Sequence, residues 1–144
     1  MGWGCGAGAA ALLLAVGGCS TGDPETAVDD AYPRLEETVS AIRADADVIF
    51  AQSGDDPTAG MATAHQELYD VPSRDPLTWR FYLSDIGTTS GGNPQAHLVG
   101  GCLEIVDADG ETAASAFRCP ASVQREFHTY LDFDINLLTG EPWD

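Results

Sequence analysis

Hydrophobic residues recur at intervals of three and four in the segment that follows residue 24. They are Val28, Tyr32, Leu35, Val39, Ile42, Ala46 and Ile49. Residues at this spacing share one face of a helix, so the pattern predicts a helix over 33–52, preceded by a helical segment over 25–32. Pro33 either begins the main helix in its first turn or kinks a longer one, and Gly54 is a suitable stop. We expect the apolar stripe to face the core, with a partner-binding face as the alternative.

A weaker helical pattern covers residues 58–69, and two prolines predict a loop over 70–76. From residue 79 the hydrophobic period changes to two, which is typical of strands. The predicted strands cover 79–83, 96–106, 112–119 and 127–137. The last of them has the cleanest alternation, and a helix through Val123 and Phe127 competes for its first half. A helix followed by a run of strands favours an α+β fold, in which the long N-terminal helix packs on a roughly four-stranded antiparallel meander.

An apolar run of alanine, glycine, leucine and valine occupies residues 7–16. A helix that spans a bilayer needs about 20 apolar residues, so this run is too short and instead fits the central region of a secretory signal. The run ends in Val16-Gly17-Gly18-Cys19, which is an aliphatic residue, two small residues and a cysteine. This ending resembles the lipobox of bacterial lipoproteins. An ordinary cleaved signal peptide with an unmodified cysteine is the alternative.

The resemblance implies that a peptidase cuts before Cys19 and that a diacylglycerol is attached to the Cys19 thiol. Residues 1–18 are then a lipoprotein signal peptide, 19–24 a short tether and 25–144 a single α+β domain, since the remaining length is that of one domain. The lipid places this domain at the cell membrane, on its extracytoplasmic face.

Acidic residues dominate the chain, which contains 23 Asp and Glu residues against six Lys and Arg, for a formal net charge of −17. All six basic residues are arginines. Such a body is repelled by nucleic acid and by anionic headgroups, so we expect no nucleic-acid partner. The membrane is then held through the lipid on Cys19, because two acyl chains anchor a protein stably. Solubility explains the acidity most simply, with a cationic partner or loosely held divalent cations as alternatives.

The four cysteines have separate expected fates. Cys5 is lost with the signal peptide and Cys19 carries the lipid, which leaves Cys102 and Cys119. A leftover pair in an exported protein is typical of a disulfide. A type II′ turn at Gly110-Glu111 places the two residues directly opposite each other in a hairpin. The disulfide then stabilises the base of that hairpin by about 3 kcal/mol in the chain-entropy model.

Sequence motifs for nucleophilic catalysis, phosphate binding and zinc binding are missing, so no metal and no cofactor is expected. Three residues remain as weak catalytic candidates. Glu104 lies in the middle of a predicted strand, where burial would raise its pKa and let it act as an acid. His128 and Asp132 share one face of the predicted strand 127–137. Solvated, outward-pointing side chains are the simpler interpretation of all three.

Aromatic residues occupy both faces of the predicted strand 79–83. Trp79, Phe81, Tyr82 and Tyr130 could line a groove for a glycan or a peptide, although core packing explains them more simply. One small domain without a catalytic constellation favours a non-catalytic binding module of the cell envelope, whose partner is a protein, a peptide or a glycan. A small envelope enzyme with carboxylate and histidine chemistry is the alternative, and a purely structural lipoprotein is a third hypothesis.

Overall fold

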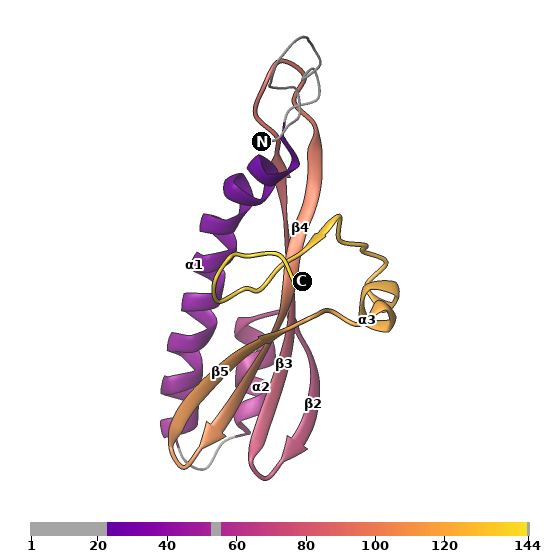
Figure 1. The fold of residues 1–144 in the computed structure, drawn as a ribbon. Coiled ribbons are helices and arrows are strands. Elements are labelled where there is room, and N and C mark those ends of the chain that lie inside the picture. The colour runs from indigo at the N-terminus through magenta and orange to yellow at the C-terminus, as the bar shows by residue number, and fades with distance from the viewer. Residues whose placement is uncertain (1–22, 53–55, 144) are drawn as a thin grey trace.

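A long helix packed on an antiparallel sheet forms the body of the protein, which confirms the predicted α+β class (Figure 1). The computed structural model describes residues 23–52 and 56–143. The predicted signal segment 1–18, Cys19 and Gly54 lie outside the described residues. Within the described ranges, no helix is both long and apolar enough to cross a membrane.

Helix α1 (Pro24–Ala51) contains both predicted helical segments as one element and continues through Pro33. It begins inside the predicted tether, because the Asp23 side chain accepts a hydrogen bond from the Glu25 backbone N–H and caps the first turn. The predicted apolar stripe faces the core. Of its predicted members, Val28, Leu35, Val39, Ile42 and Ala46 are buried, and Tyr32 and Ile49 are partly buried against the core. Ala27 and Ala31 join the same buried face.

The sheet is a meander in which each strand pairs with the next one along the chain. Its strands are β2 (Leu68–Arg74), β3 (Leu77–Thr88), β4 (Ala96–Ala108) and β5 (Glu111–Phe117). The pairing of β3 with β4 is continuous from Thr78–Val106 to Thr88–Ala96, so it contains no bulge.

The face of the sheet toward α1 carries the main hydrophobic core. Trp79, Phe81 and Leu83 point into it from β3, and Leu103 and Ile105 from β4. A Cβ atom at Gly87 would meet the backbone carbonyl of Ala27, so this glycine lets α1 lie directly on β3.

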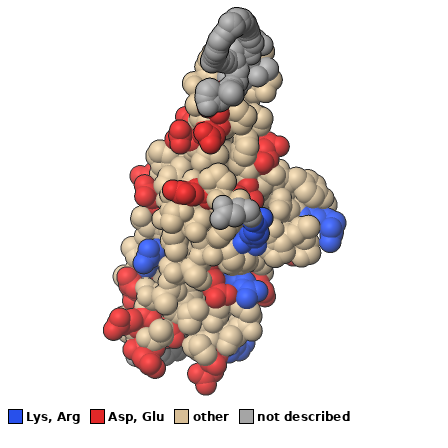
Figure 2. Space-filling view, viewed as in Figure 1, with Lys and Arg blue, Asp and Glu red and all other residues tan. Residues whose placement is uncertain are grey.

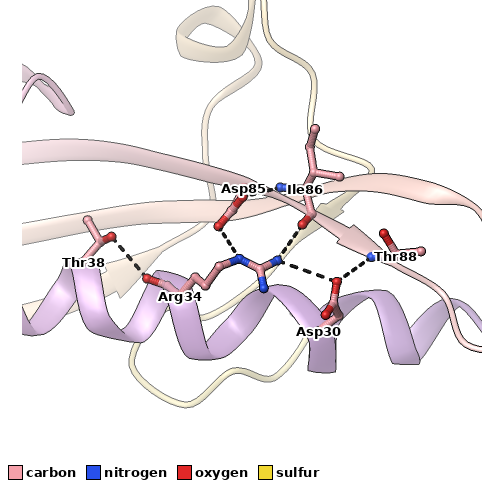
Figure 3. A network of polar contacts seen from close by, with 6 residues as sticks. All are labelled: Asp30, Arg34, Thr38, Asp85, Ile86 and Thr88. Carbon is pink, nitrogen blue, oxygen red and sulfur yellow. Dashed lines mark hydrogen bonds and ion pairs between the residues drawn. The ribbon is translucent and has the colours of Figure 1, made fainter.

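A polar network fixes α1 to the same strand at the edge of this core (Figure 3). Arg34 Nε donates to Asp85 Oδ2 over 2.8 Å, and Arg34 Nη2 donates to the Ile86 carbonyl over 2.7 Å. Asp30 Oδ2 lies 3.6 Å from Arg34 Nη2 and accepts from the Thr88 N–H over 2.8 Å. One helix turn is therefore bonded to Asp85, Ile86 and Thr88 near the end of β3.

The segment after α1 differs from its prediction. Helix α2 (Pro57–Ala64) ends before the predicted boundary at residue 69, and the predicted loop 70–76 belongs largely to β2. Pro72 does not prevent strand formation because β2 is an edge strand, where a missing N–H breaks no ladder bond. The pairing of β2 with β3 is also irregular on either side of Asp70.

The turn between β4 and β5 is also displaced from its prediction. Ala108 pairs with Glu111, so the two central residues are Asp109 and Gly110, whose φ values are 57° and 88°. Positive φ at both positions is typical of a type I′ turn, which Asp-Gly favours over the predicted type II′ turn. The register is therefore shifted by two residues, and Cys102 faces Phe117 instead of Cys119.

The predicted strand 127–137 is wrong for most of its length. Helix α3 (Ala121–Glu126) comes before it, and only β6 (Phe133–Asp134) pairs with β4, in parallel. The chain crosses the edge of β4 there, beyond the end of β5, with α3 on one side of the sheet and α1 on the other (Figure 1). Ile135 and Leu137 are buried against the α1 side, so their alternation reflects an extended chain rather than a long strand.

Candidate functional site

The face of the sheet opposite α1 has a covered part and an open part. The covered part is a small cluster formed by Tyr82, Cys102, Cys119 and Val123. Cys102 and Cys119 form the predicted disulfide. Since Cys119 lies beyond the end of β5, the bond holds the chain that leads into α3 against the middle of β4.

Hydrogen bonds to the backbone complete the covered part. The Tyr82 hydroxyl donates to the Thr129 carbonyl over 3.0 Å, and Asp134 Oδ2 accepts from the Cys119 N–H over 2.8 Å. Burial, and to a lesser degree the charge of Asp134, raises the pKa of Tyr82 to about 12. Burial also raises the pKa of Asp134, against the lowering effect of its bond from Cys119.

The open part, which we name the aromatic face, consists of Tyr69, Arg80, Glu104, Phe117 and Phe127. Arg80 Nε donates to Glu104 Oε2 over 2.9 Å, and its guanidinium carbon lies 5.4 Å from the centre of the Phe117 ring. The Phe127 ring lies 6.2 Å from Tyr69 in an edge-on arrangement and 5.4 Å from Tyr82. The Phe117 ring therefore lies against the ion pair, and Tyr69, on which Phe127 packs, is close enough to interact with the charge of Arg80.

The ionisation of the aromatic face follows from these contacts. The hydrogen bond to Glu104 raises the pKa of Arg80, so the guanidinium keeps its charge. Burial raises the pKa of Tyr69, although the charge of Arg80 opposes this effect. At neutral pH the face thus presents a neutral phenol and an ion pair whose side chains are 38% exposed for Arg80 and 25% for Glu104. Such a surface can stack on a ligand and donate hydrogen bonds to it.

The structure places the four predicted binding aromatics in different parts of the molecule. Trp79 and Phe81 are fully buried on the α1 side, where Trp79 stacks on Phe50 at 4.5 Å, so these two residues line no surface groove. Tyr82 lies beneath Phe127 and is 6% exposed. Tyr130 is 62% exposed and belongs to the irregular chain after α3.

The three weak catalytic candidates do not form one site. Glu104 is paired with Arg80, whereas Asp132 Oδ2 accepts from the Leu98 N–H over 2.8 Å and lies 3.6 Å from His97 Nδ1. His128 is exposed, has a φ of 54° and follows α3. The shared strand face expected for His128 and Asp132 does not exist, because the chain is irregular from 127 to 132.

A closer histidine–carboxylate contact lies elsewhere and was missed from the sequence. His65 Nε2 is 2.7 Å from Asp45 Oδ2, and His65 Nδ1 is 3.9 Å from Glu67 Oε1. This contact ties α1 to the residue that follows α2. In the described parts of the chain, no three His, Cys, Asp or Glu side chains are grouped so that they could hold a metal ion.

Two clefts among residues 23–52 and 56–143 are bordered by none of the five residues of the aromatic face. One of about 430 Å³ separates the start of α1 from the C-terminal segment and is bordered by Glu25, Asp29, Tyr32 and Glu141. A smaller one of about 210 Å³ is bordered by Arg34, Glu67, Tyr82 and Asp85. Carboxylates outnumber arginines over the face seen in Figure 2, in line with the net charge.

The sequence contained a signal for part of the aromatic face. Alternation along β3 places Arg80 and Tyr82 opposite Trp79 and Phe81, so a charged residue between aromatics marked the second face. Tyr69 and Phe127 gave no such signal, since one lies in the irregular strand β2 and the other after α3.

Comparison with protein-family models, with curated proteins and with solved structures finds no match to this chain.

Proposed function

We propose that this protein is a lipoprotein, anchored on the extracytoplasmic face of the cell membrane, that acts as a non-catalytic binding module of the envelope. The aromatic face is the observation that carries the binding function, and its partner is a protein, a peptide or a glycan. Cys19 is the residue that carries the lipid.

Two features support the anchor. Val16-Gly17-Gly18-Cys19 resembles a lipobox and follows an apolar run of signal-peptide length. The disulfide between Cys102 and Cys119 suits an oxidising compartment outside the cytoplasm. The net charge of −17 disfavours electrostatic attachment to anionic lipids, so a covalent lipid explains attachment better.

The geometry of the aromatic face supports binding rather than catalysis. Rings at Tyr69, Phe117 and Phe127 offer stacking surfaces around the charged donor Arg80. Glu104, the one carboxylate of this face, is held by Arg80 over 2.9 Å and does not converge with Asp132. An enzyme would need such groups together in one concave site.

The anchor is tested by the intact mass of the protein, extracted from the membrane fraction without reduction. We expect a chain that begins at Cys19, carries a diacylglycerol and lacks the two hydrogens of the Cys102 and Cys119 thiols. A chain that begins at Met1, or one that begins at Cys19 with a free thiol, contradicts the lipoprotein assignment.

The binding function is tested by photo-crosslinking in intact cells. A benzophenone amino acid replaces Phe127 on the aromatic face, and the matched control carries it at Val48, which is 57% exposed on α1. We expect a discrete adduct from position 127 alone, which weakens at least tenfold when Arg80→Ala is added. Equal adducts from both positions, or no effect of R80A, contradict a binding role for this face.

A further inference from the structure

The tip of the β3–β4 hairpin lies beside the first turns of α1. The Ser90 N–H donates to Thr26 Oγ1 over 2.8 Å, and the Thr88 N–H donates to Asp30 Oδ2 over the same distance. Figure 1 shows the hairpin continuing along the start of α1 at one end of the molecule. The two hydrogen bonds, together with the Arg34 network of Figure 3, fix the hairpin tip close to the point where the described chain begins.

The length of chain before this point limits how far the domain can lie from a lipid on Cys19. Five peptide steps separate Cys19 from Pro24, where α1 begins. A fully extended chain covers about 3.3–3.6 Å per residue, so this segment reaches about 18 Å at most. A lipid anchor at Cys19 therefore keeps this end of the molecule close to the bilayer surface.

The hairpin tip is also the part of this end that carries no charge. Residues 88–96 contain no acidic or basic side chain, although the chain as a whole has a net charge of −17. The side chains from Ser90 to Ala96 are exposed, and none of them is aromatic or a large aliphatic residue. Contact with headgroups therefore requires no burial of charge, and the tip has no side chain that would insert into the acyl region.

We propose that the β3–β4 hairpin tip, residues 89–95, rests on the phospholipid headgroups and that the domain stands upright on the membrane. The inference rests on the proposed lipid anchor. Strand β4 has 13 residues, so the β4–β5 turn is held about 40 Å further from the bilayer than the tip. The N-cap and first two turns of α1, which lie beside the tip, carry the carboxylates of Asp23, Glu25, Asp29 and Asp30. These carboxylates are repelled by an anionic membrane surface at low ionic strength. The tip should therefore contact a zwitterionic membrane surface more closely than an anionic one.

The experiment measures energy transfer from single dyes on the lipidated protein to acceptor dyes on the headgroups of phosphatidylcholine vesicles. The full chain is expressed with Asn93→Cys in the tip or Asp109→Cys in the β4–β5 turn, and the processed protein is purified from membranes. Its only free thiol is then the introduced one, because Cys19 is modified, Cys5 is removed, and Cys102 and Cys119 are bonded.

We expect transfer from position 93 to exceed transfer from position 109 at least fivefold, and phosphatidylglycerol at low salt to reduce the transfer at position 93. Equal transfer from both positions, or stronger transfer from position 109, overturns the upright orientation. The intact mass of the same samples separates the two hypotheses. A lipidated chain with equal transfer overturns only the orientation, whereas a chain without diacylglycerol overturns the anchor and the orientation together.

Discussion

The two faces of the sheet are stabilised in different ways. On the α1 side, regularly spaced apolar side chains from one long helix meet those from β3 and β4 in a continuous core. On the opposite side, α3 has six residues, and its cluster depends on a disulfide, the Tyr82 hydroxyl and the Asp134 carboxylate. The first face thus depends on packing area, and the second on a few specific bonds.

This difference explains why the second face holds the candidate binding surface. A long helix covers its side of the sheet completely enough to bury Trp79 and Phe81. On the other side, α3 is short, and the chain around it is held by one disulfide and a few hydrogen bonds. It therefore leaves Arg80 and its aromatic neighbours accessible. Incomplete coverage on one side therefore provides an exposed surface without weakening the core on the other.

The largest effect should come from removing a core side chain on the α1 side. Trp79→Ala eliminates a fully buried ring, its stacking on Phe50 and its hydrogen bond to Thr58, so we expect a loss of about 3–5 kcal/mol in the free energy of unfolding. Urea denaturation measures it, with Phe127→Ala on the opposite face as the matched control. A loss from F127A as large as that from W79A would show that the two faces contribute alike.

Breaking the disulfide should have an intermediate effect that is largest on the opposite face. The bond joins residues 17 positions apart, and replacing both cysteines by serine should cost about 3 kcal/mol in the global free energy of unfolding. Hydrogen exchange should increase more from residue 118 to 132, where local opening becomes easier, than in the middle of α1, which exchanges through global unfolding. An equal increase in both segments would mean that the disulfide has no local effect on the opposite face.

The smallest effect should come from the Tyr82 hydroxyl. Tyr82→Phe removes the bond to the Thr129 carbonyl and should cost about 1 kcal/mol at neutral pH. It should also change the alkaline profile of stability. The native phenol keeps its proton up to a pKa of about 12, whereas an unfolded one loses it near 10.0, so the native state binds more protons in this window.

The wild type should therefore lose stability as pH rises from about 10 to 12, and Y82F should lack this contribution. Denaturation curves at several pH values measure the difference between the two proteins. An unchanged difference across this window would indicate that the Tyr82 phenol titrates normally in the folded protein.

The sequence predicted the α1 side better than the opposite side for a physical reason. Helix and strand periods are local properties, so the apolar stripe of α1 and the alternation in β3 could be recognised without tertiary information. Which segments pair as strands was harder to predict. β2 was predicted as helix end and loop because tertiary pairing overrides the local effect of Pro72, and 127–137 was predicted as a strand because an extended segment alternates whether or not it pairs.

The candidate site depended even more on distant contacts. The pairing of Cys102 with Cys119 followed from counting cysteines, although the turn type and register were wrong by two residues. The meeting of Tyr69 with Phe127 depends on how α3 crosses the sheet, which no local pattern encodes. Residue types and local alternation therefore revealed the disulfide and the position of Arg80, but not the aromatic residues that gather beside it.

The meander also sets the order in which the chain can fold. The three main strand pairs each join neighbours in the sequence, so each requires only a hairpin to close, at a small loop-entropy cost. β6 differs, because it must find β4 at Val99 and Gly100 after about thirty intervening residues. We therefore expect the hairpins to form early and the C-terminal segment to join last, so that the sheet forms before Ile135 and Leu137 complete the core on one face and Phe127 packs on the other.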